Sequence, residues 1–493
     1  MAAILHYGRM QSSGIFWGLL GGVLSWSMAA HAEVKLPAIF GDNMVLQARQ
    51  PVPVWGWAAP GARVTVKFAG ETKTARAAAD GRWRVKLGKF KASFTPQILV
   101  VEAGDTKTFT NILVGEVWLA SGQSNMEKPI GKQRGQKPCL NAEQELAAAN
   151  YPNLRIFQVE KMQSPQARED LEKYHGWQPC SSNALDSISF SAAAYFFGRE
   201  IHTNLNVPVG LIESSWGGTK IEPWTPPVGF AAIPALAGLA QPDQGTNKIP
   251  NTTPMVLYNA MIAPLAGFAI RGALWYQGES NVGDTNYDVK MSALVGGWRQ
   301  VWQEGDFPFY FVQIAPYKYI KNLTNYSADT DPLPNLWVQQ SRAARQLKHV
   351  GMIVTTDLVD DVNNIHPRDK ASVGHRLARL ALNKTYDQDL ACAGPALAKL
   401  RISGRKAVLK FTHTDGGLMS KDGRPLTWFS ISGADGKFVP AEAKITGQTV
   451  EVSAAGVEQP VAVRFAWNQL AQPNLCNGAG LPAEPFSTQI LVK

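Results

Sequence analysis

The segment VWLASGQSNMEKPI, from Val117 to Ile130, begins as a buried strand and stops being one within a few residues. Its apolar start runs into Ser121-Gly122-Gln123-Ser124-Asn125, five small or polar residues in a row. Clusters of such residues after an apolar run are typical of a turn. A strand that ends by presenting a serine between two amides indicates a site for chemistry at its carboxyl end.

The strand before this turn is one of six near-continuous apolar segments in the middle of the chain. They are Asn111–Ala120, 153–159, 207–214, 270–276, 307–314 and 349–356. Amphipathic segments with a helical period lie between them: Phe190–Leu205, Tyr287–Trp302, Leu336–Lys348 and Arg368–Asn383. Apolar strands alternating with helices predict an α/β domain with a mostly parallel sheet, covered on both faces. Residues 131–150 and 226–254 are predicted to be loops.

The flanking regions differ from the middle, because short alternating strands and Pro-Gly, Asp-Gly and Gly-rich turns replace the helical pattern. Such punctuation predicts small antiparallel β-domains. We therefore divide the chain into a leader at 1–32, an N-terminal β-domain at 33–110, a central domain at 111–392 and a C-terminal β-domain at 393–493.

The leader has the pattern of a secretory signal peptide. Arg9 precedes an apolar stretch that ends in Ala30-His31-Ala32, an A-x-A cleavage site. We expect cleavage before Glu33 and export to the periplasm or the medium, with no membrane attachment afterwards. The alternative is an uncleaved anchor.

Composition narrows the function classes. The 493 residues are 45% hydrophobic and 18% charged, which favours a globular protein. The formal net charge is +9, but no run of five or six like charges occurs, so nucleic-acid binding is not expected. The four cysteines, Cys139, Cys180, Cys392 and Cys476, form no C-x-x-C pair, and both disulfides and isolated thiols are open. Nothing indicates the oligomeric state.

Four sets of residues that could take part in catalysis follow predicted strands. They are Ser124, the pair Gly217-Gly218, the amide-rich turn with Gln277, Glu279 and Asn281, and His366. In parallel sheets, ligands bind beyond the carboxyl ends of the strands, so one edge would gather all four.

Acyl transfer is the chemistry that needs this set. A serine hydroxyl attacks only when a base, usually a neutral histidine, accepts its proton, so activity should fall below a pKa of about 6.5. The oxyanion needs fixed donors. The candidates are the N–H groups of Ser124 and Gly218, with the side-chain amide of Gln277 or Asn281.

Rival residues exist for both roles. GESN at 278–281 echoes GQSN at 122–125, so spacing alone does not prefer Ser124 to Ser280, and neither serine stands in G-x-S-x-G. Among the histidines, His366 follows a parallel strand, and His175 in a polar connection remains an alternative.

The motifs GQSNM, SWGGTKIEPW, WYQGESN and IHPRDK resemble the sialate O-acetylesterase family of SGNH-type hydrolases. The stretch from Leu36 to Gly61 and the tail from Arg464 to Phe486 are also similar to that family, so the resemblance spans nearly the whole mature chain. It implies a flavodoxin-like three-layer α/β/α core with flanking β-domains. It also implies removal of O-acetyl groups from carbohydrate without a metal or other cofactor.

The resemblance also implies roles for individual residues. Ser124 is then the nucleophile, with Ser280 its neighbour, and His366 is the base. Gly218 matches the oxyanion glycine block, and Gln277 takes the place of an asparagine in typical members. Gln123, Asn125 and Glu279 are expected to shape the site.

One departure concerns the acid that orients the histidine. SGNH hydrolases usually place an aspartate three residues before the histidine, and this family often has one two residues before it, where this chain has Asn363 and Asn364. Either Asp361 reaches the imidazole from further back, or the site is a Ser-His dyad. We favour the dyad and keep Asp361 as the candidate third member.

The sequence gives less information about which acetylated sugar is the substrate. Trp216 and Trp224 are the candidate substrate-binding residues, because they lie in a loop beside the site. Acetylated plant cell-wall polysaccharide, such as xylan or xyloglucan, is the alternative substrate, and a non-catalytic carbohydrate-binding protein is the alternative class.

Overall fold

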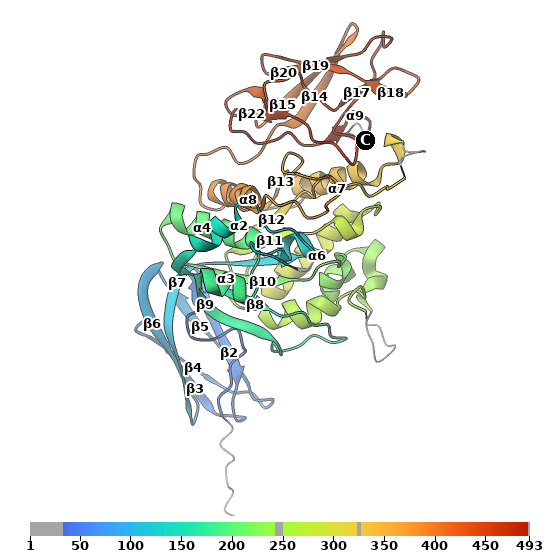
Figure 1. Cartoon of the computed structure of the whole chain (residues 1–493). Helices are drawn as coiled ribbons and strands as arrows, with labels where there is room; N and C mark the ends of the chain where they lie inside the picture. Colours follow the sequence, from blue (N-terminus) through green and yellow to red (C-terminus); the bar gives the residue numbers. More distant parts are fainter. Residues whose placement is uncertain (1–32, 134, 242–249, 323–326, 492–493) are drawn as a thin grey trace, which may run out of the picture.

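The computed structural model of the chain describes residues 33–133, 135–241, 250–322 and 327–491 (Figure 1). The predicted signal peptide lies outside the described residues. Figure 1 shows three parts in chain order: an N-terminal β-domain, a central α/β region and a C-terminal β-domain.

A parallel sheet forms the centre. Its order is β13-β12-β11-β7-β10-β8-β9, and β9 runs antiparallel to β8 at the edge. The strands are β7 (Thr106–Gly122), β8 (Asn150–Val159), β9 (Tyr174–Ser181), β10 (Val209–Ser215), β11 (Gly272–Tyr276), β12 (Phe309–Val312) and β13 (Val350–Ile353). The expected parallel strands are all present, whereas β9 lies where the sequence indicated only a polar connection.

Helices cover both faces of this sheet. Helices α4 (Ala192–Leu205) and α8 (Lys370–Lys384) pack together on one face, where Phe197 of α4 meets Trp118 of β7 edge to face. Helices α6 (Tyr287–Trp302) and α7 (Pro332–Gln346) contact each other on the other face, where Trp298 of α6 meets Trp275 of β11. The expected three-layer α/β/α architecture is therefore confirmed.

The segments predicted as loops contain short helices. Helix α2 (Ala142–Ala147) lies in the first, and α5 (Pro227–Ala231) with a 3-10 turn at Pro234–Ala240 lies in the second. The Ala- and Pro-rich sequences of these segments did not predict helices. Such short helices gain their stability from packing, as α5 does against α6.

Strand β7 joins the N-terminal domain to the central sheet without a break. Its first part pairs with β6 (Ser93–Glu102) and β1 (Val45–Gln47), and its last part pairs with β10 and β11. The proposed boundary at 110/111 therefore falls inside one strand, and the four-part division of the chain stays a prediction.

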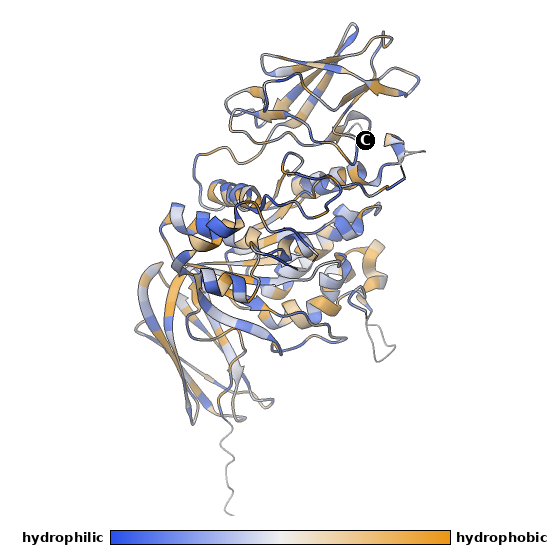
Figure 2. Cartoon of the chain, in the orientation of Figure 1, coloured by the Kyte–Doolittle hydropathy of each residue, from blue (hydrophilic) through white to orange (hydrophobic). Residues whose placement is uncertain are grey.

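The N-terminal domain is completed by β3 (Arg63–Phe68) with β4 (Glu71–Arg76), and by β2 (Pro51–Trp57) with β5 (Arg82–Lys89). Figure 2 shows polar and apolar stretches alternating along these ribbons. In β5 the alternation is strict, because Trp83, Val85 and Leu87 are buried and the residues between them are exposed. One face of this strand thus packs on the core, as period 2 requires.

The C-terminal domain contains small antiparallel sheets over one apolar core that includes Leu409, Ile431, Val450 and Phe465. One sheet has β14 (Ala396–Ser403), β15 (Lys406–Thr412), β20 (Thr449–Ser453) and β19 (Glu442–Thr446), and another has β18 (Phe438–Pro440), β17 (Phe429–Ser432), β21 (Ala462–Phe465) and β23 (Phe486–Ser487). Strands β16 (Leu418–Ser420) and β22 (Leu475–Asn477) form a third pair.

The four cysteines are free thiols in the structure, and three of them are buried. No helix within the described ranges is long and apolar enough to cross a membrane.

Candidate active site

The turn after β7 carries Ser124 at the start of the one-turn helix α1 (Ser124–Glu127). Gly122 precedes it with φ of +139°, and a Cβ there would lie 2.2 Å from the carbonyl oxygen of Tyr276 in β11. Only glycine fits so close to a neighbouring strand. The N–H of Gln123 donates to that same carbonyl at 3.0 Å, which fixes the turn at the carboxyl edge of the sheet.

The loop after β10 packs directly on this turn. A Cβ on Gly217 would lie 3.1 Å from the Ser124 Cβ, so glycine permits the close approach. The N–H of Gly217 donates to the Glu127 carboxylate at 2.6 Å. The next residue, Gly218, is exposed and has φ of +75°, and its N–H has no acceptor within the described residues. The loop of Gly218 thus contacts the turn of Ser124, and the backbone N–H of Gly218 is available to donate to a ligand.

Asn125 ties the turn to the segment that contains His366. Its side-chain N–H donates to the carbonyl of Ile365 at 2.9 Å, and its side-chain oxygen accepts from the Lys370 ammonium at 2.8 Å. Two segments 240 residues apart are therefore joined one residue after Ser124 and one residue before His366. Within the described residues the Ser124 hydroxyl and the imidazole are not hydrogen-bonded; such bonds commonly tighten only when substrate binds.

His366 is held in a neutral state. Burial, followed by the positive charges of Lys370 and Lys128, lowers its pKa to about 4. Its backbone N–H donates to the side-chain oxygen of Asn364 at 3.0 Å, so Asn364 acts on the backbone of His366. A neutral imidazole is the form that accepts a proton.

The acidic residues upstream of His366 point elsewhere. The Asp361 carboxylate accepts from the N–H and the side-chain amide of Asn363, at 2.9 and 3.2 Å, which lowers the pKa of Asp361. Asp360 lies 3.8 Å from Arg368. Within the described part of the chain, no carboxylate is hydrogen-bonded to the imidazole. This geometry does not give Asp361 the expected contact.

The side chain of Gln277, a candidate oxyanion donor, is already hydrogen-bonded within the protein. It is fully buried, and its side-chain nitrogen lies 2.7 Å from Asn281 Oδ1, 3.0 Å from Gln123 Oε1 and 3.1 Å from the Thr219 carbonyl. Three acceptors already share its two N–H groups. Its own oxygen accepts from Tyr287 at 2.8 Å. In this conformation Gln277 positions Gln123 and the turn, and it has no free donor for an oxyanion.

Glu279 is also part of the supporting network. One of its carboxylate oxygens accepts from Asn125 at 2.5 Å, and the other has no partner within the described residues. Burial raises the pKa of Glu279. The rival Ser280 is nearby, where its N–H donates to the Gln123 side chain at 3.2 Å.

The two candidate tryptophans differ. Trp224 is fully buried; its indole N–H donates to Thr219 at 2.9 Å and its ring meets Trp275 edge to face. The structure thus contradicts a substrate contact for Trp224, because core packing consumes its faces. Trp216 is half-buried, and its backbone N–H donates to the Gly122 carbonyl at 3.1 Å, so Trp216 lies beside the turn.

A cavity of about 320 Å³ adjoins the turn through Glu127, and Lys161, His175 and Glu213 also line it. Burial raises the pKa of Glu213 to about 8. His175 pairs across the sheet edge with Gln158 and lies 3.7 Å from Glu160. It therefore lines this neighbouring cavity, whereas the Asn125 contacts join the segment that contains His366 to the turn that contains Ser124.

Sequence reasoning missed two residues that hold the site together. Glu127 anchors Gly217, and Lys370 joins Asn125 at 2.8 Å to the Pro367 carbonyl at 2.8 Å. The spacing of Glu127 carried a signal, because it lies three residues after Ser124 in the same helical turn. Lys370 carried no such signal, because helix α8 begins at Lys370 and His366 lies before it.

Comparison with known proteins identifies the family of the chain. Residues 114–383 match the family model described as carbohydrate esterase, sialic acid-specific acetylesterase. Sialate O-acetylesterase from Homo sapiens is 30% identical over 97% of both chains, and that from Mus musculus is 29% identical over 92% of this chain and 94% of its own. The crystal structure of a carbohydrate acetylesterase from Xanthomonas citri superposes with a TM-score of 0.83, at 35% identity, over 92% of this chain and 99% of that chain.

The fold and the site thus define an SGNH-type hydrolase, and the protein is an esterase. More particularly, the chain belongs to the carbohydrate esterase family of sialic acid-specific acetylesterases, as its motifs led us to expect.

Proposed function

We propose that this carbohydrate O-acetylesterase works through a Ser124–His366 dyad and an acetyl-enzyme intermediate. The observation that carries the proposal is the pair of hydrogen bonds by which Asn125 donates to the Ile365 carbonyl and accepts from Lys370, because it links the turn of the serine to the segment of the histidine. The lowered pKa of His366 supports its role as base, because it keeps the imidazole free to accept a proton at neutral pH.

The reaction then has two steps. The Ser124 oxygen attacks the acetyl carbonyl carbon while its proton passes to His366, and the tetrahedral intermediate collapses as the imidazolium returns the proton to the leaving sugar oxygen. Water attacks the acetyl-enzyme in the second step. His366 takes the proton of the water and returns it to Ser124, and acetate leaves.

The N–H groups of Ser124 and Gly218 are the proposed oxyanion donors. Gly218 is supported by its exposed position beside Ser124 and by an N–H that is not engaged within the described residues. Gln277 is proposed to act indirectly, because its contacts with Gln123 and Thr219 hold both of the loops that carry these donors.

The proposed substrate is an O-acetylated sialic acid, the substrate named for the relatives. Exposed Lys220, two residues after Gly218, is a suitable partner for its carboxylate, and Trp216 for its ring. Acetylated xylan or xyloglucan is the alternative, since the Xanthomonas citri relative is described only as a carbohydrate acetylesterase.

Two measurements test these proposals. Hydrolysis of p-nitrophenyl acetate should be lost in Ser124→Ala and in His366→Ala, and equal rates in wild type and Ser124→Ala would refute the assignment. Acetate release from O-acetylated sialic acid, acetylated xylan and acetylated xyloglucan then identifies the substrate.

We also propose that residues 1–32 are removed during export. N-terminal sequencing of the exported protein should begin at Glu33. A chain that retains Met1 in the membrane fraction would support the anchor instead.

A further inference from the structure

The N-terminal domain has a surface on which one strand presents aromatic rings and its partner presents cations. Trp55 and Trp57 lie two residues apart on β2, and they pair across the sheet with Arg84 and Arg82 of β5. Directly opposed residues share one face of a sheet. Lys86 extends the same row, because it is exposed like both arginines and pairs with Pro53.

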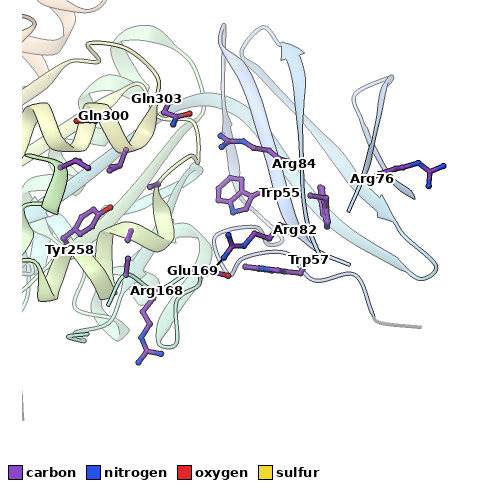
Figure 3. A pocket seen from close by; sticks show the side chains of 17 residues that line it. Trp55, Trp57, Arg76, Arg82, Arg84, Arg168, Glu169, Tyr258, Gln300 and Gln303 are labelled. Atoms are coloured by element: carbon purple, nitrogen blue, oxygen red, sulfur yellow. Dashed lines mark hydrogen bonds and ion pairs between the residues drawn. The ribbon is translucent and has the colours of Figure 1, made fainter. Parts of the chain in front are cut away.

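This face lines a cavity of about 870 Å³ between the N-terminal domain and the central region. Figure 3 shows Trp55, with Arg84 and Arg82 on either side of it, facing Tyr258, Gln300 and Gln303 across the cavity. An adjoining cavity of about 530 Å³ shares Arg84 and Gln303 and extends to Lys86. The cavity linings include no residue of the Ser124 turn, the Gly217 loop or the His366 segment.

The positive charge on this face is only partly compensated. Arg82 forms an ion pair with Glu169, which Figure 3 marks. Arg84 and Lys86 have no ion-pair partner among the described residues, and the Arg84 guanidinium lies 5.8 Å from the centre of the Trp55 ring. The nearby Glu304 accepts the N–H of Ile270, and burial raises its pKa to about 7, so it offsets these charges only in part.

We propose that this face, formed by Trp55, Trp57, Arg84 and Lys86, is a second carbohydrate-binding site that takes a glycan bearing carboxylate groups. Arg84 lies over one face of Trp55 and Lys35 over one face of Trp57, which leaves the opposite faces for a sugar. Indole faces pack against the C–H faces of pyranose rings, and two of them at a spacing of two strand residues suit consecutive sugars of an extended chain. The guanidinium fork matches a carboxylate with two parallel hydrogen bonds. Half-buried tryptophans beside exposed arginines, as found here, are typical of binding surfaces.

This inference goes beyond the esterase activity and does not depend on which residue carries the chemistry. The site would hold an acidic glycan while the ester site works on its acetyl groups. The shared chemistry is a carboxylated sugar, whose source is either sialic acid or a uronic acid.

The test measures binding by calorimetry to the intact Ser124→Ala protein, so that acetyl groups are not hydrolysed. The probes are sialyllactose, a galacturonate oligosaccharide and a neutral xylo-oligosaccharide. We expect one of the two carboxylated probes to bind, which identifies the source. Adding Arg84→Gln to this protein removes a charge-assisted hydrogen bond, and adding Trp57→Ala removes an aromatic contact. Either change should weaken that binding about tenfold.

Matched controls are Arg405→Gln and Trp428→Ala, which change exposed residues of the C-terminal domain. They should bind like the parent, and Arg84→Lys should recover only part of the affinity because it keeps the charge but loses the fork. In the protein that retains Ser124, the single variant Arg84→Gln should hydrolyse p-nitrophenyl acetate at the wild-type rate. Unchanged affinity in both Arg84→Gln and Trp57→Ala, or equal binding of the neutral probe, would overturn the proposal.

Discussion

Replacing Asn125 with alanine should separate the serine turn from the histidine segment. The side chain is fully buried and makes three hydrogen bonds, to Glu279 at 2.5 Å, to the Ile365 carbonyl at 2.9 Å and to Lys370 at 2.8 Å. In Asn125→Ala the buried Lys370 ammonium would keep the Pro367 carbonyl as an acceptor, and Glu279 would lose the partner of its first carboxylate oxygen.

The size of the effect follows from these partners. Leaving a buried polar group without its hydrogen-bond partner costs about 1–3 kcal/mol. At about 2–4 °C per kcal/mol, the melting temperature should fall by about 2–12 °C. The turnover number should fall about 10²-fold, because small displacements of a catalytic group have effects of that order.

The assays are a thermal melt and hydrolysis of p-nitrophenyl acetate below the melting temperature. The matched control is Asn204→Ala, since Asn204 is exposed on α4 and donates only within that helix. Its effect on stability should stay within about 0.5 kcal/mol. An Asn125→Ala protein that melts and turns over like wild type would refute the tie between the two segments.

Three further outcomes follow from the same structure. Asp361→Asn should leave the turnover number on p-nitrophenyl acetate unchanged, whereas loss of a triad aspartate costs about 10⁴-fold, so a loss of that size would restore the triad. The ratio kcat/KM should persist below pH 6.5 and decline only as pH falls through about 4, because the neutral form of His366 is the base; a decline centred on pH 6.5 in a pH-rate profile would contradict the lowered pKa of His366. Trp224→Ala should destabilise the protein by about 3–5 kcal/mol in a denaturant titration, while Trp216→Ala should keep the stability and raise KM for the sugar substrate; a stable Trp224→Ala protein would exclude the core role.

Periodicity predicted the central domain closely because each element records its environment in its own residues. The segment predicted as a helix at Tyr287–Trp302 has those bounds in α6. Strands β11, β12 and β13 lie within the predicted segments, whereas β7, β8 and β10 overlap theirs and extend beyond them. Strand β9 was not predicted, because Gly176 and Pro179 interrupt its pattern and its pairing with β8 has two irregularities. Such an edge strand depends on its neighbour more than on its own sequence.

The sequence pattern could not predict which way a side chain points or what it contacts. Gln277 follows a strand as an oxyanion donor would, yet its amide binds Gln123, 154 residues away. Trp224 lies in a loop and is nevertheless core, because the loop folds back onto Trp275.

Local period and contiguous motifs were enough to predict the layered fold, the strand end that carries Ser124, and the family. The folded structure was needed to find that Asn125 and Lys370 join the serine turn to the histidine segment, and that Asp361 binds Asn363 instead of the imidazole. The physical reason is that a hydrogen bond is formed by atoms a few ångströms apart, and the folded chain alone sets which distant residues reach that range.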